Sequence, residues 1–372
     1  MNTPLPDTAA VHAARDRIRE WVRETPIIAL KGPGARPIVL KLECLQRSGS
    51  FKLRGALNRL LALDPAQRKA GVITASGGNH GLGVAWAGWL LGIPVTVVAP
   101  TTSPRVKRQA LVASNADLVL VEGGYPAADR LARERAERAG LIYIHAYDDP
   151  AVIAGQGTLV AEMIEQEPRI GTLVVAVGGG GLAAGATLAA AGRRVVGVEP
   201  EGCPTMHTAL AAGGPVTLDR IASIAADSLG AGRAGELTYP LCRDGLDRVE
   251  LVDDDALIAA RQWLWDHVRV AAEHGAVAGL AALMQGRLDD DPGPIGVIIC
   301  GANTDPAGLV ETDDMETRPD VVPVEAHTLS RLPANAPLAR RRTMFADSDS
   351  LFRALDEGAT LDQNVDDDET ES

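Results

Sequence analysis

A lysine stands at position 52 in the stretch SGSFKLRGAL (48–57), between a Gly-Ser turn and a segment that predicts a helix. Lysines are mostly exposed, so a surface charge is one interpretation of Lys52. The other is chemical: a desolvated amine loses its proton easily and becomes a nucleophile toward aldehydes. The choice depends on which ligand-binding segments accompany it.

Four consecutive glycines, Gly178 to Gly181, lie between an apolar stretch at 172–177 and a run of small residues at 182–192. The first stretch predicts a strand and the second a helix. Glycines leave backbone N–H groups unobstructed, and a helix start adds partial positive charge, so this loop predicts a phosphate site. A flexible turn is the alternative, although ordering four glycines costs much conformational entropy.

A second Gly-rich loop, ASGGNHG, covers residues 75–81. Its backbone amides, at a predicted helix start, could hold a carboxylate, and Asn79 could donate a hydrogen bond to a ring oxygen. Pyridoxal 5'-phosphate carries both an aldehyde and a phosphate. It therefore accounts for Lys52 and the four glycines together, and we predict it as the cofactor.

A dinucleotide site is the alternative for the glycine run. Gly179, Gly181 and Ala184 fit the G-x-G-x-x-G/A spacing loosely, and Glu199 ends the next predicted strand. The chain would then be a nicotinamide-dependent oxidoreductase. That interpretation gives Lys52 and Asn79 no role.

The elements that must position these loops alternate between strands and helices. Strands that are apolar throughout and alternate with helices indicate parallel sheets covered on both faces, with ligands at the carboxyl ends of the strands. The predicted strands are 37–43, 71–76, 94–100, 116–122, 142–147, 172–177, 194–200 and 293–301. The predicted helices are 11–25, 51–63, 82–92, 103–114, 125–139, 151–166, 182–192, 255–269 and 277–286.

Composition excludes several classes of function. The net charge of −13 argues against nucleic acid and anionic membranes as partners. No run approaches the roughly 18 apolar residues of a membrane span, and the first residues do not resemble a signal peptide. The four cysteines match no zinc or secreted disulfide pattern, so we expect a cytoplasmic protein. They are Cys44, Cys203, Cys242 and Cys300.

Several motifs together resemble one family over residues 10–310. SGSFKLRGA, ASGGNHG, VGGGGLAAG, GVEP, AADSLG and CGANTD occur in the order found in fold-type II pyridoxal-phosphate enzymes, and the chain is most similar to the serine/threonine dehydratases. The resemblance implies an α/β fold of two open, mostly parallel twisted sheets flanked by helices, and a homodimer. It implies a large cofactor domain (1–45 and 147–312), a small domain (46–146) and an acidic tail (313–372), which we expect to be disordered.

The resemblance also implies roles for individual residues. Lys52 would be the catalytic residue joined to the cofactor aldehyde. Phe51 would lie against the cofactor, Asn79 would contact its 3'-oxygen, and Cys300 would face its pyridine nitrogen. The phosphate cradle would be Gly178, Gly179, Gly180, Gly181 and Leu182. The substrate carboxylate would be held by Ser76, Gly77, Gly78, Asn79 and His80.

Three positions depart from the family pattern. Glu199 resembles the cation-site carboxylate, but Thr205 stands where metal-dependent relatives have Asp. This argues against a divalent metal and leaves a monovalent cation open. Gly77 replaces a hydroxyl residue of the racemases, which disfavours racemisation. His274 replaces a proline after Glu273.

We therefore predict a lyase that acts on an amino acid and eliminates water from L-serine or L-threonine, releasing pyruvate or 2-oxobutanoate with ammonia. Lys52 would act as general base. A thiol at Cys300 is a poor acid and would leave the pyridine nitrogen neutral, which favours β-elimination over transamination. The alternatives that keep the cofactor are a 3-hydroxyaspartate dehydratase, a β-replacement enzyme and a racemase.

Overall fold

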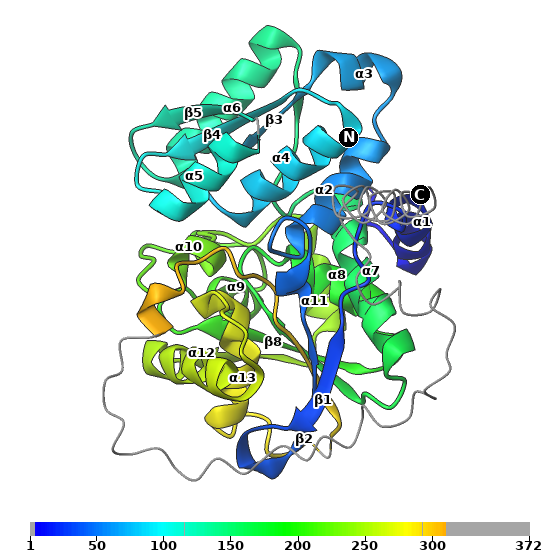
Figure 1. The fold of residues 1–372 in the computed structure, drawn as a ribbon, viewed down its shortest axis with the longest axis vertical. Coiled ribbons are helices and arrows are strands. Elements are labelled where there is room, and N and C mark those ends of the chain that lie inside the picture. The colour runs from blue at the N-terminus through cyan, green and yellow to red at the C-terminus, as the bar shows by residue number, and fades with distance from the viewer. Residues whose placement is uncertain (1–3, 115, 292, 310–372) are drawn as a thin grey trace, which may run out of the picture. The chain divides into compact units, whose positions relative to one another are not determined.

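The computed structural model describes residues 4–114, 116–291 and 293–309. The tail predicted for 313–372 lies outside the described residues. Within them, two sheets and their helices form the fold (Figure 1). No helix in this part of the chain is both long and apolar enough to cross a membrane.

The larger sheet has six strands in the order β1-β2-β10-β7-β8-β9. Only β1 and β2 pair antiparallel; every other neighbour is parallel. The bounds are β1 (Ile27–Lys31), β2 (Pro37–Lys41), β7 (Thr172–Ala176), β8 (Arg194–Pro200), β9 (Arg248–Val252) and β10 (Ile295–Ile298). The central strands β7 and β10 are buried at every residue, as expected of a sheet covered on both faces.

The smaller sheet is fully parallel, in the order β5-β4-β3-β6. Its strands are β3 (Val72–Ala75), β4 (Val95–Pro100), β5 (Asp117–Val121) and β6 (Ile142–Tyr143). Val72, Val95 and Val97 pack into a core with α2, α4 and α5, whereas Ile73 and Val98 pack against α6. Alternate residues of one strand thus face opposite layers.

The described residues contain thirteen α-helices. They are α1 (Thr8–Ile18), α2 (Lys52–Leu61), α3 (Pro65–Ala70), α4 (Asn79–Leu91), α5 (Arg105–Ala113), α6 (Tyr125–Ala139), α7 (Pro150–Gln166), α8 (Gly181–Ala189), α9 (Thr205–Ala212), α10 (Ala226–Leu229), α11 (Thr238–Gly245), α12 (Asp254–Val268) and α13 (Ala278–Met284). Short 3-10 turns cover Pro33–Ala35, Glu43–Leu45, His274–Val277 and Ala307–Leu309. Helix α2 packs against both α4 and α7, and α7 packs against α8.

The start of α2 is fixed by a buried charge network. Arg54 donates to both carboxylate oxygens of Glu43, at 2.7 and 2.9 Å, and to Glu162 at 3.0 Å. Lys41 also contacts Glu162. Burial alone would neutralise Glu43, but Arg54 outweighs it and holds the pKa of that carboxyl below its ordinary value. Because removing one partner of a buried ion pair is costly, this network restricts the position of α2 relative to Glu43 and Glu162.

Most predicted elements are confirmed, and the differences have local causes. The prediction missed β1 and β9, which are short and partly exposed. The helix predicted to reach residue 25 ends at Ile18. The strand predicted for 142–147 stops at Tyr143, because the His145 ring accepts hydrogen bonds from the N–H groups of Tyr147 and Asp148 and turns the chain.

Candidate active site

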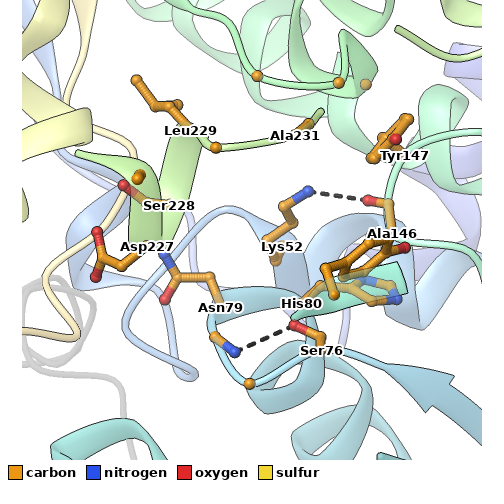
Figure 2. A pocket seen from close by; sticks show the side chains of 18 of the residues that line it. Lys52, Ser76, Asn79, His80, Ala146, Tyr147, Asp227, Ser228, Leu229 and Ala231 are labelled. Carbon is orange, nitrogen blue, oxygen red and sulfur yellow. Dashed lines mark hydrogen bonds between the residues drawn. The ribbon is translucent and has the colours of Figure 1, made fainter. Parts of the chain in front are cut away.

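One cavity of about 470 Å³ gathers the residues that the sequence singled out. It opens at the carboxyl ends of β3, β4, β7 and β10. Every residue predicted to bind cofactor or substrate lines it: Phe51, Lys52, Ser76, Gly77, Gly78, Asn79, His80, Gly178, Gly179, Gly180, Gly181, Leu182 and Cys300. Figure 2 shows this pocket from close by. The roles given to these residues remain predictions.

Lys52 is the first residue of α2 and its amine faces the cavity. The Nζ atom donates a hydrogen bond to the carbonyl oxygen of Ala146 at 2.9 Å (Figure 2). Burial lowers the pKa of the Lys52 amine from 10.5 to about 8. Among the residues that the structure describes, no side-chain carboxylate pairs with this amine, so the site favours a neutral nucleophile.

The segment that follows β10 contacts the residue before this lysine. The N–H of Phe51 donates to the carbonyl oxygen of Cys300 at 3.1 Å, and the Phe51 ring centre is 5.2 Å from Lys52 Nζ. Burial raises the pKa of the Cys300 thiol to about 12. The thiol therefore stays protonated near neutral pH and presents no anion to the cavity.

The glycine run forms a turn that leaves no room for side chains at Gly179 and Gly180. Gly180 has φ +95°, and a β-carbon there would lie 2.6 Å from Met206 Cε. A β-carbon on Gly179 would lie 2.5 Å from the Tyr147 ring. Helix α8 begins at Gly181 with no side-chain cap, so its first N–H groups remain available. This is the donor set that a phosphate requires.

The second Gly-rich loop joins β3 to α4. The N–H of Gly78 donates to Ser76 Oγ at 3.2 Å, which closes the turn (Figure 2). Helix α4 also lacks a side-chain cap. Asn79 Nδ2 lies 2.9 and 3.0 Å from the two carboxylate oxygens of Glu273, and Asn79 Oδ1 accepts from Asn303 at 2.8 Å. Asn79 is therefore held in one orientation.

His80 is buried and neutral. Its Nε2 lies 3.3 Å from the carbonyl oxygen of Ile144, so this nitrogen carries the proton, and Nδ1 meets no partner among the described residues. Burial, followed by the nearby Lys52, lowers the pKa of the imidazole to about 3. His80 can therefore accept a hydrogen bond but cannot serve as a cation near neutral pH.

An ion-pair network beside the cavity was not predicted. Lys107 Nζ lies 2.7 Å from Asp227 and 2.8 Å from Glu273, and its side chain is 1% exposed. Burial opposes this charge, but the two carboxylates outweigh it and raise the pKa of Lys107. Asp227 belongs to the AADSLG motif, but nothing in the sequence pairs it with a lysine on α5.

Two tyrosines and a serine at the cavity were also missed. Tyr125 and Tyr147 line it, and the Tyr147 hydroxyl donates to the carbonyl oxygen of Arg233 at 3.0 Å. Burial raises the pKa of Tyr147 to about 12, so it stays protonated. Ser103, in the β4–α5 connection, lines the cavity beside Gly77. No motif marks these three positions.

Glu199 is not among the residues that line the cavity. Its carboxylate accepts hydrogen bonds from the N–H groups of Met206 at 2.8 Å and His207 at 2.9 Å, in the first turn of α9. Burial raises the pKa of Glu199 to about 8. Within the described ranges no cluster of His, Cys, Asp and Glu has metal-binding geometry. The monovalent-cation role of Glu199 stays a prediction.

The cavity fits pyridoxal phosphate by the chemistry of its donors. Lys52 offers a neutral amine for an aldehyde, and the turn at Gly178–Gly181 offers backbone N–H groups in a space that a β-carbon would fill. Cys300 offers an uncharged partner for a ring nitrogen. The three features open onto one cavity.

Comparisons with known proteins agree with this geometry. A family model described as pyridoxal-phosphate-dependent enzyme matches residues 18–301. The chain is 40% identical to phenylserine dehydratase of Ralstonia pickettii over 314 residues, covering 82% of this chain and 95% of that protein. It is 35% identical to L-threonine ammonia-lyase of Geobacter sulfurreducens over 302 residues, covering 79% and 75%.

A solved structure of maize serine racemase matches with a TM-score of 0.79 and 33% identity, covering 82% of this chain and 96% of that one. The described fold, two mostly parallel sheets flanked by helices, thus matches the fold of that solved structure. We conclude that the chain belongs to the fold-type II family of pyridoxal-phosphate-dependent enzymes.

Proposed function

We propose that the protein is a dehydratase that removes water from L-serine and L-threonine, releasing pyruvate or 2-oxobutanoate with ammonia. The observation that carries the proposal is the Lys52 amine, with a pKa of about 8, in one cavity with a glycine turn and a protonated thiol. When bound, the cofactor supplies an aldehyde for amines and a ring that accepts electrons.

Lys52 would move the proton of the reaction. With a pKa of about 8, a useful fraction of the amine is neutral near pH 7 and can accept a proton from the substrate α-carbon at Nζ. The carbonyl oxygen of Ala146 orients Nζ, and Phe51 packs beside it. A lysine with its ordinary pKa would hold far less neutral base at this pH.

Cys300 and the β3–α4 loop would direct the reaction. Because the Cys300 thiol stays protonated, it cannot charge a ring nitrogen beside it as a carboxylic acid would. This favours loss of a β-substituent over transamination. The uncapped start of α4 and the Ser76–Gly78 turn would hold the substrate carboxylate, since a helix start attracts anions.

A second candidate substrate is a β-hydroxy amino acid with an aromatic ring. The chain contains only four tyrosines, and two of them, Tyr125 and Tyr147, line this cavity. A relative at 40% identity is named phenylserine dehydratase. Aromatic rings at a pocket wall favour a flat apolar group by about 0.5–1.5 kcal/mol beyond area burial.

The test is release of keto acid from L-serine, L-threonine, threo-phenylserine and threo-3-hydroxyaspartate by the purified holoenzyme. We expect release from serine or threonine, loss of the visible cofactor absorption in Lys52→Ala, and no change in Lys69→Ala, an exposed lysine. Release from phenylserine alone would favour the second candidate. Retained activity in Lys52→Ala would refute both.

Further expectations belong to the same proposal. They are a homodimer, a cytoplasmic location, a monovalent cation near Glu199, and the domain division at residues 46–146. Gel filtration and a potassium titration of activity test the first and third directly.

A further inference from the structure

Ser103 occupies space that a side chain at position 77 would otherwise fill. A β-carbon built on Gly77 would lie 1.7 Å from Ser103 Oγ and 2.5 Å from Ser103 Cβ. The next atom, Ala99 Cβ, would be 3.5 Å away, an ordinary contact distance. Any other residue at position 77 would therefore clash with Ser103 unless one of the two moved.

The connection that carries Ser103 is fixed at both ends. The N–H of Ser103 donates to the carbonyl oxygen of Pro100 at 3.0 Å, and the N–H of Thr101 donates to Val121 at 3.0 Å. Pro104 then precedes α5 with its backbone restricted by the ring. The β4–α5 connection thus places the Ser103 hydroxyl next to the Ser76–Gly78 turn.

The hydroxyl is available to a ligand. Ser103 is half-buried and lines the cavity. Within the part of the chain that the structure describes, no hydrogen bond of this hydroxyl to protein is found, whereas the neighbouring Thr101 hydroxyl turns away to Glu122 at 3.2 Å. A serine hydroxyl carries one donor proton, which an anion beside the uncapped α4 would accept.

We propose that the Ser103 hydroxyl donates a hydrogen bond to the carboxylate of the amino-acid substrate. The proposal rests on the proposed function in taking an amino acid as the substrate. Ser103 would be a further substrate-binding residue, supplied from a different element than the loop that the sequence identified. Ser103 thus supplies a hydroxyl group in the part of the cavity where Gly77 has no side chain.

The test compares two small amines that carry no β-leaving group. L-alanine has the carboxylate and ethylamine lacks it, and the change in the visible spectrum of the holoenzyme reports the affinity of each. Ser103→Ala should weaken L-alanine binding about tenfold or more, the usual loss for a hydrogen bond to a charged group, and leave ethylamine binding unchanged. Thr101→Ala, from the same connection, is the matched control.

A residue exchange adds a second arm. Gly77→Ser alone should bind L-alanine poorly, because its β-carbon meets Ser103. Combined with Ser103→Gly, which removes both clashing atoms, it should bind L-alanine more tightly than Ser103→Gly alone. The thermal midpoint of each holoenzyme shows whether a variant is folded.

Three outcomes would overturn the proposal: unchanged L-alanine affinity in Ser103→Ala, an equal loss for both amines, or an exchange variant no better than Ser103→Gly. The proposed function fails separately. In that case no β-hydroxy amino acid yields a keto acid, while the dependence of L-alanine binding on Ser103 persists.

Discussion

The backbone of Phe51 is hydrogen-bonded to that of Cys300, with 3.1 Å between the Phe51 nitrogen and the Cys300 oxygen. An isolated bridge between Ser50 and Gly301 extends the contact. The loop before Lys52 is therefore fixed to the end of β10. The Lys52 amine and the Cys300 thiol reach one cavity because the residue before Lys52 is bonded to the backbone of Cys300.

Cofactor uptake should depend on pH through Lys52. The pKa of Lys52 in the folded protein is about 8, below the ordinary 10.5. The fraction of the amine that is neutral should therefore rise with pH up to about pH 8 and change little above it. Below pH 8 each unit should lower the uptake rate about tenfold. Mixing cofactor-free protein with pyridoxal phosphate from about pH 6 to about 9 measures this by absorbance. Acetyl-lysine controls for the cofactor's own ionisation; a rate still rising like that of acetyl-lysine at pH 9 would contradict the prediction.

Cys300 should resist alkylation in the folded protein. With the thiol pKa at about 12, the thiolate at pH 8 is about a thousandfold scarcer than in a free cysteine, and only the thiolate reacts. Mass spectrometry of the Cys300 peptide after iodoacetamide treatment measures this. All four cysteines are buried and should react once urea unfolds the chain. Rapid labelling of native Cys300 would show that its thiol is ionised.

Gly180→Ala should weaken cofactor binding more than Gly192→Ala does. Both glycines have positive φ, at +95° and +82°, so each alanine carries backbone strain of about 1–2 kcal/mol. Only at Gly180 would the β-carbon also meet Met206 and Thr238; nothing lies within 4 Å at Gly192. Equilibrium dialysis with pyridoxal phosphate separates the two effects. Equal cofactor affinities would mean that the turn at Gly180 does not hold the phosphate.

Lys107→Met should destabilise the protein by about 3–5 kcal/mol, because it leaves Glu273 and Asp227 without their shared cation. Glu273 is 2% exposed and cannot recover hydration. Urea unfolding of the holoenzyme measures the loss. Arg169→Met, which removes an ion pair whose arginine is 81% exposed, should leave the midpoint unchanged. A similar midpoint for both variants would show that burial does not strengthen the first pair.

Local features of the chain were predictable from the sequence. The strand–glycine–helix order placed Gly178–Gly181 at a helix start, and α6 was predicted with its observed bounds. The short edge strands were not predictable, because β9 has only five residues and its first four are all half-buried, without alternation. Strands of this length carry too little periodicity to distinguish them from loops.

By itself, the sequence determined the type of fold and the candidate residues of the site, since strand burial, helix period and glycine backbone freedom are properties of neighbouring residues. Only the tertiary structure decided which residues meet across the cavity. It brought Ser103 against Gly77, Tyr147 against Gly179 and Lys107 against Glu273. These contacts join separate elements, and they depend on how the elements pack around the cavity, which no local pattern encodes.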